Sequence, residues 1–128
     1  MVAGSEALGD GTLDVLFAPR RFADANPRTM AAFLAAIDEA NALIAAYPGP
    51  AAENLIALAA AKISPDDMLA TVRDPDTKFD TTPHGVMAFA TFMKGAGSIK
   101  QEPAGWSDMF MPLLKGRLGS WLDTRAGF

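Results

Sequence analysis

The chain has 128 residues, a formal net charge of −4 and no cysteine, and half of its residues are apolar. This length suits one domain, and the absence of cysteine excludes a disulfide framework, a thiolate zinc site and a cysteine nucleophile. The 11 lysines and arginines are scattered along the chain, so nucleic-acid binding is not expected. Many of the apolar residues are alanine, which favours helix, and the composition predicts a mainly α fold.

The first structured segment predicted by the sequence is a β-strand. Residues 1–11 contain three glycines and predict a loop, whereas Leu13–Ala18 combines valine, leucine and phenylalanine in a strand-like pattern. A single strand cannot satisfy its own backbone hydrogen bonds. The segment therefore pairs with strands outside this chain, pairs with a second copy of itself, or is not a strand. We expect one or two short strands at most, with self-association through Leu13–Ala18 as one alternative.

A short helical turn at residues 20–25 and a long helix from Pro27 to Tyr47 follow. Asn26 is suited to the N-cap, and proline at the first helical position loses no hydrogen bond. The apolar residues of the long helix recur at the spacing of one helical face. They are Met30, Phe33, Leu34, Ile37, Ile44 and Tyr47.

Two further helices are expected after a proline-rich break at residues 48–50. Pro50 can lie in the first turn of the second helix, which should pack against the long helix as an antiparallel hairpin. Ser64 is expected to cap a third helix, with Pro65 at its first position and Asp67 completing a capping box.

The remainder of the chain alternates irregular segments with short helices. Residues 74–83 form an irregular crossing in which Phe79 is expected to be a buried anchor. Thr82 and Pro83 then predict the start of another helix, which the glycines at 95 and 97 end. One last turn is expected at Trp106–Phe110.

No residue pattern requires catalysis or a metal ion. His84 is the only histidine, and a structural role near a helix start explains it better than a catalytic triad, because no nucleophile-elbow pattern is present. The aspartates between residues 66 and 80 lack the alternating ligands and the terminal glutamate of a calcium loop. We therefore expect no enzymatic activity, no metal site and no cofactor.

A series of moderately specific signals nevertheless resembles a known family. The residues that carry the resemblance are, in chain order, Ser5-Glu6, Leu8-Gly9, Asp14-Val15-Leu16, Phe22, Asn26-Pro27, Ala40-Asn41, Asp74-Pro75, Lys78-Phe79, Pro83-His84-Gly85-Val86, Phe92-Met93, Gly97-Ser98-Ile99-Lys100, Pro103 and Trp106-Ser107-Asp108-Met109-Phe110. This order resembles the C-terminal third of periplasmic substrate-binding proteins of ABC importers for nitrate, sulfonate and taurine. The resemblance makes residues 1–112 one domain and leaves residues 113–128 as an irregular tail.

The resemblance implies a two-lobed α/β fold that binds a small anionic solute between its lobes and presents it to an ABC permease. This chain would be a partial lobe, with Leu13–Ala18 completing the sheet of that lobe. Such proteins also have an N-terminal portion with a signal peptide and the second lobe, so we expect a fragment that lacks most of the cleft. The family is periplasmic, whereas the location of this chain as written stays open.

The same resemblance places Ser5, Glu6 and Thr12 nearest to the cleft, and these are the candidate ligand-binding residues. The hydroxyls of Ser5 and Thr12 can donate hydrogen bonds to an anion, whereas the Glu6 carboxylate would repel one. Turn and cap roles explain the three residues equally well. The superfamily also includes thiamine-pyrimidine synthesis proteins that use a histidine and a pyridoxal cofactor, but no lysine or histidine setting here supports that chemistry.

A function of another class stays open beside this one. The chain can be an independent helical protein–protein interaction module whose apolar face or edge strand docks on a partner. A monomer with an unpaired Leu13–Ala18 segment would favour the fragment, and a symmetric strand-paired dimer would favour the module. An enzyme that uses His84 is the third alternative and would lose turnover in a His84→Ala variant.

Overall fold

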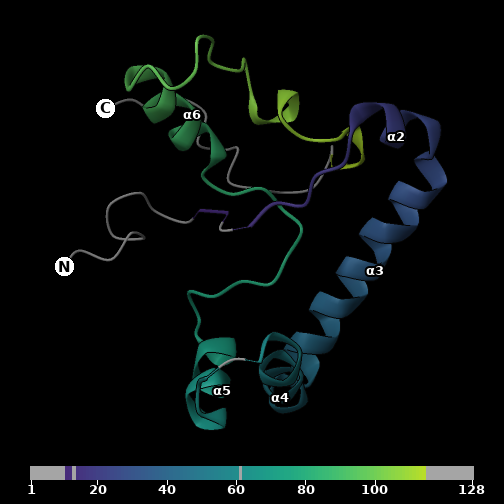
Figure 1. The fold of residues 1–128 in the computed structure, drawn as a ribbon, viewed down its shortest axis with the longest axis vertical. Helices are drawn as coiled ribbons and strands as arrows, with labels where there is room; N and C mark the ends of the chain where they lie inside the picture. The colour runs from purple at the N-terminus through teal and green to yellow at the C-terminus, as the bar shows by residue number, and fades with distance from the viewer. Residues whose placement is uncertain (1–10, 13, 61, 115–128) are drawn as a thin grey trace. The chain divides into compact units, whose positions relative to one another are not determined.

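The computed structural model describes residues 11–12, 14–60 and 62–114. The chain divides into two compact units, which Figure 1 shows as a ribbon. Unit 1 contains Met1–Arg20 and Thr82–Phe128, and unit 2 contains Arg21–Thr81. The described residues are mainly helical, which confirms the mainly α part of the expected fold class. The partial lobe of a periplasmic-binding-protein-like fold stays a prediction.

The strand expected at Leu13–Ala18 is not formed in the described residues. Leu13 lies outside them, and residues 14–19 have no helix, turn, bend or strand assignment. An extended segment becomes a strand only when its backbone pairs with a neighbour, and the described part of the chain supplies no such neighbour. The side chains of Val15, Leu16 and Phe17 are exposed as a result, and Phe17 keeps 94% of its surface.

The helices α2, Arg20–Ala25, and α3, Pro27–Ala46, lie where the sequence predicted them. Asn26 occupies the N-cap position of α3, but its side chain makes no capping hydrogen bond there. Its Nδ2 atom instead donates to the carbonyl of Phe22 at 2.9 Å, and its backbone N–H donates to the same carbonyl at 3.0 Å. Asn26 therefore closes α2 before α3 begins.

The long helix α3 has a half-buried stripe and no fully buried residue. Met30, Leu34, Ile37 and Ile44 form this stripe, as the spacing predicted, whereas Phe33 remains exposed. By length and composition alone α3 could also cross a membrane, which is weak evidence because core helices of water-soluble proteins pass the same test.

The helix α4 spans Pro48–Ala59, and Pro50 lies in its first turn as expected. Only Tyr47 separates it from α3, and Tyr47 has φ −133° and ψ 64°, outside the α region. An antiparallel helix hairpin needs a loop of about 2–5 residues, so one residue cannot reverse the chain. Figure 1 accordingly shows α3 from the side and α4 nearly end-on, and the predicted hairpin is wrong.

The helix α5, Pro65–Arg73, packs against α4 more extensively than α3 does. The buried residues Ala52 and Met68 lie one on each of α4 and α5. The predicted Ser64 cap of α5 is confirmed, because Ser64 Oγ accepts from the Asp67 N–H at 3.1 Å. Asp67 Oδ2 accepts from the Ser64 hydroxyl at 2.6 Å, whereas in a full capping box it would accept from the Ser64 backbone N–H. A serine cap satisfies one of the backbone donors that every helix start leaves unpaired.

In unit 1 the helix α6 spans Val86–Gly95, with Ala90 buried. The predicted start at Thr82 and Pro83 is wrong, because the N-cap is Gly85 in the left-handed region at φ 62°. Glycine reaches this region without the steric cost that a Cβ atom imposes.

The end of α6 is a Schellman motif. The Ser98 N–H donates to the Met93 carbonyl at 2.9 Å, and the Gly97 N–H donates to the Lys94 carbonyl at 3.1 Å. Gly97 has φ 73°, which is the left-handed residue that this motif requires. The prediction that glycine ends this helix is therefore confirmed.

The segment after α6 returns to the helix and ends in two short turns. Thr91 donates to Glu102 Oε1, and Lys94 Nζ donates to the Lys100 carbonyl, so residues 100–102 are fastened to α6. The 3₁₀ turn η1, Trp106–Asp108, confirms the predicted last turn, and η2 spans Pro112–Leu114. The Trp106 and Phe110 rings are 6.2 Å apart between centroids. Residues 115–128 of the expected tail lie outside the described residues.

Candidate functional site

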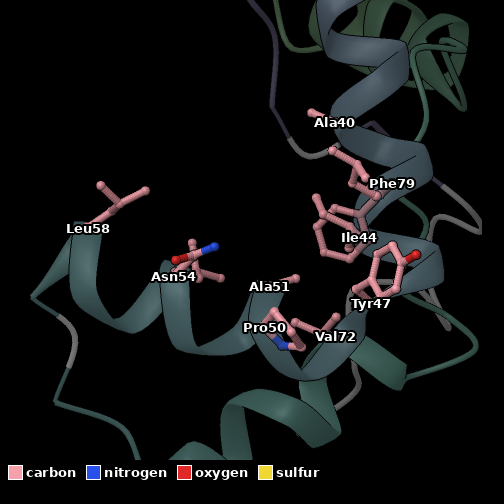
Figure 2. Close-up of a pocket in the computed structure, with 11 residues that line it drawn as sticks. Ala40, Ile44, Tyr47, Pro50, Ala51, Asn54, Leu58, Val72 and Phe79 are labelled. Atoms are coloured by element: carbon pink, nitrogen blue, oxygen red, sulfur yellow. The ribbon is translucent and has the colours of Figure 1, made fainter.

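The candidate site is an open apolar groove in unit 2, with a volume of about 540 Å³. Its lining comes from α3, the Tyr47 junction, α4, α5 and the segment that follows α5. The lining residues are Ala40, Leu43, Ile44, Tyr47, Pro50, Ala51, Asn54, Leu55, Leu58, Val72 and Phe79. Figure 2 shows Phe79, Ile44 and Tyr47 on one side of the groove and Asn54 and Leu58 along α4 on the other.

The abrupt corner between α3 and α4 creates the groove. Two antiparallel helices would have closed their apolar faces on each other, whereas the single junction residue Tyr47 turns α4 away from α3. Leu43 and Leu55, one on each helix, therefore stay 53% and 43% exposed. The groove is thus a gap between two apolar helix faces that do not meet.

Phe79 lies on the same side of the groove as Ile44 and Tyr47, and hydrogen bonds on either side of it in the chain hold its segment in place. After α5 the Asp74 Oδ1 atom accepts from the Asp76 N–H at 2.8 Å, and the Asp74 carbonyl accepts from the Thr77 N–H at 3.0 Å. This turn redirects the chain. Two residues after Phe79, Thr81 Oγ1 donates to Asp38 Oδ1 on α3 at 2.6 Å. The segment that carries Phe79 is therefore tied to α3.

The lining of the groove is almost entirely apolar. Its lining residues include no acid, lysine, arginine or histidine, and its polar groups are the Asn54 carboxamide and the Tyr47 hydroxyl. Apolar walls with a few hydrogen-bonding groups are typical of ligand and partner sites. Elsewhere in the described ranges, no three histidine or acidic side chains gather in a way that could hold a metal ion.

Sequence reasoning identified part of this groove. The predicted stripe of α3 supplied Ile44 and Tyr47, and the irregular crossing supplied Phe79. Phe79 is not the buried anchor that we expected, because it keeps 39% of its surface exposed on the open side of the groove. Leu43 and Leu58 were missed because they lie outside the half-buried faces of their helices. The spacing of apolar residues therefore gives no signal that these two leucines line a groove.

The three candidate ligand-binding residues are not brought together in the described part of the chain. Ser5 and Glu6 lie outside the described residues. Thr12 is half-buried and lies against the loop before α6. Its hydroxyl oxygen accepts from the His84 N–H at 2.8 Å, and its own N–H donates to the His84 carbonyl at 2.9 Å. These two bonds give Thr12 a structural role within unit 1.

Comparison with known proteins adds no relative: no family model, no curated protein and no solved structure matches this chain.

Proposed function

We propose that the chain is a section of the solute-binding protein of an ABC importer for a small anion of the nitrate, sulfonate or taurine type. In this role it has no enzymatic activity and needs no cofactor. It contributes part of one lobe, and the assembled protein delivers its anion to a membrane permease in the periplasm.

The observation that carries this proposal is that several residues of the sequence resemblance lie at the ends of helices. Pro27 is the first residue of α3, Asp74 is the C-cap of α5, Gly85 is the left-handed N-cap of α6, and Gly97 is the left-handed residue after it. Backbone constraints restrict such positions to a few residue types. These four residues of the resemblance therefore lie where helices begin or end, which supports a shared fold.

The burial pattern of the described residues also supports a role within a larger body. Ala52, Met68 and Ala90 are the buried hydrophobic residues in the described ranges, whereas fifteen large apolar side chains are exposed. A contiguous apolar surface is normally covered by another part of a protein or by a partner. The groove and the residues around Phe17 are the surfaces that such a body would cover.

Under this proposal, the chain by itself does not bind the anion. Of the three candidate contacts, Thr12 lies in the described residues; its hydroxyl oxygen accepts from the His84 N–H, and its hydroxyl hydrogen is a single donor, which is not enough to hold an anion in water. We therefore expect no heat in calorimetry with nitrate, taurine or alkanesulfonates at millimolar concentration.

A section exchange tests the function directly. The corresponding C-terminal section of a sulfonate-binding protein of this family is replaced by residues 5–112 of this chain, and sulfonate binding is measured by calorimetry. We expect a folded chimera that retains binding. A chimera in which the section is replaced by an unrelated helical segment of equal length is the control. A folded chimera without sulfonate binding would contradict the proposal.

The open groove favours a second candidate, an independent helical interaction module. Such a module uses its apolar walls to hold a partner and needs no solute. In that case the section exchange fails, while the chain alone shows specific and saturable association through the groove.

A further inference from the structure

We infer that two copies of this chain pair through residues 15–19 as an antiparallel, two-fold symmetric strand pair centred on Phe17. Beyond each end of the pair, Asp14 of one copy faces Arg20 of the other, which is the first residue of α2. The inference concerns the chain by itself and goes beyond the proposed function. Sedimentation measures the pairing and the section exchange measures solute binding, so the failure of one is distinguishable from the failure of the other. A symmetric strand-paired dimer would favour the independent module, the second candidate function, over a section of a solute-binding protein.

The first observation is the state of the segment. Residues 14–19 run without helix, turn or bend, and Val15, Leu16 and Phe17 are 61%, 72% and 94% exposed. Successive side chains of an extended chain point to opposite faces, so Val15 and Phe17 share one face and Leu16 lies on the other. A run of this kind, apolar on both faces, presents its backbone groups to any strand that can pair with it.

Two-fold symmetry restricts the possible registers. In a symmetric antiparallel pair, one residue lies opposite its own copy, and the residues on either side of it pair in a fixed order. A pair centred on Phe17 places Leu16 opposite Ala18, Val15 opposite Pro19 and Asp14 opposite Arg20. A centre at Leu16 would place Asp14 opposite Ala18 instead.

Charge complementarity selects the register centred on Phe17. Asp14 and Arg20 bracket the apolar run, and this register brings the carboxylate of one copy to the guanidinium of the other at both ends of the pair. Opposite charges that face each other across two strands stabilise the pair, and like charges destabilise it. The charges therefore favour a second copy of this chain over an apolar strand of unrelated sequence.

Pro19 is consistent with the same register. Residues opposite each other in an antiparallel pair alternate between hydrogen-bonded and non-hydrogen-bonded positions. If Phe17 faces Phe17 at a non-hydrogen-bonded position, Pro19 also falls at one, where its missing N–H is not needed. Leu16 and Ala18 then exchange the backbone bonds, and the two phenylalanine rings lie where cross-strand side chains are closest.

Charge reversal tests the pairing. The full chain, Asp14→Lys and Arg20→Glu are compared by sedimentation equilibrium from roughly 10 µM to 1 mM, because a strand pair is small beside a standard interface of about 800 Å² per partner. We expect the unaltered chain to dimerise weakly. Each variant alone should dimerise about tenfold less tightly, because like charges then meet at both ends. A mixture of the two variants should recover the dimer, because opposite charges meet again.

A cross-link tests the centre of the pair in a chain that has no cysteine of its own. Phe17→Cys should form an intermolecular disulfide on mild oxidation, because its Cα atoms would lie within the span of a disulfide. Leu16→Cys should not form one. In this register Leu16 faces Ala18, so the Cα atoms of the two copies of residue 16 would lie roughly 8 Å apart, beyond the span of a disulfide.

Leu58→Lys, on the groove, is the control for a contact elsewhere and should leave the dimer unchanged. An unaltered chain that stays monomeric overturns the inference, and so does a mixture of charge variants that fails to recover the dimer. Loss of the dimer in Leu58→Lys would assign the contact to the groove and would also overturn it.

Discussion

Gly97 and Gly95 lie two residues apart at the end of α6, and alanine at these positions should change stability in opposite directions. Gly97 has φ 73°, and an added Cβ atom would meet no other atom within 4 Å. The space is open, so the cost of Gly97→Ala is the conformational cost of the left-handed region alone. For a residue with a Cβ atom, this cost is about 1–2 kcal/mol.

Gly95→Ala is the matched control. Gly95 is the last residue of α6, and an added Cβ atom there also meets nothing within 4 Å. Alanine is the better helix former by up to about 1 kcal/mol in a helix interior. We therefore expect a small gain in stability from Gly95→Ala, of less than that value because the position is terminal.

Chemical unfolding followed by circular dichroism at about 222 nm, where helices give a strong negative signal, measures both effects. Gly97→Ala should lower the midpoint at unchanged slope, and a loss of about 1 kcal/mol reduces the folding equilibrium constant roughly fivefold. Gly95→Ala should leave the midpoint unchanged or raise it. If Gly97→Ala proved as stable as the unaltered chain, the Schellman end of α6 and the reasoning from its backbone would be wrong.

Three further outcomes follow from other contacts. Ser64→Ala removes the cap of α5 and should cost about 1 kcal/mol in the same unfolding assay, whereas Ser64→Thr should retain most of the stability. Thr81→Val removes the hydroxyl that donates to Asp38 and should cost about 1 kcal/mol of stability. The double variant with Asp38→Ala should lose less stability than the sum of the two single losses, and a loss equal to that sum would show that the bond contributes nothing. Leu58→Lys should weaken the binding of an apolar fluorescent dye without lowering stability, because the Leu58 side chain is 88% exposed on the groove. The same change at Phe92, in unit 1, is its control, and equal loss of dye binding in both variants would show that the dye does not report on the groove.

Local signals in the sequence predicted most of the helices. Ser64 was recognised as the cap of α5 because it and Asp67, the residue whose N–H it accepts from, lie three positions apart. The glycine end of α6 was recognised for the same reason. The start of α6 was misplaced because Thr82 and Pro83 give the same local signal whether or not a helix follows. The left-handed backbone of Gly85 lies next to His84, which bonds to the distant Thr12, and a local pattern does not show such a contact.

The groove was predicted only in part, because it depends on the direction of one helix relative to another. Both apolar faces were visible in the sequence, and they suggested two helices packed against each other. The junction at Tyr47 decides otherwise, and the missing information was that α4 begins at Pro48 and leaves one residue for the turn. The predicted contacts at Ser5 and Glu6 lie outside the described residues and stay predictions.

The hydrogen bonds between Thr12 and His84 join residues that are 72 positions apart in the chain. Unit 2, by contrast, is one continuous stretch, Arg21–Thr81. During synthesis from the N-terminus, all of unit 2 is available before His84 has been added, so its helices can assemble while Thr12 still waits for its partner. Closing so long a loop also costs more chain entropy than any local turn in unit 2. We therefore expect the continuous stretch to fold first and the unit made of two distant pieces to fold last.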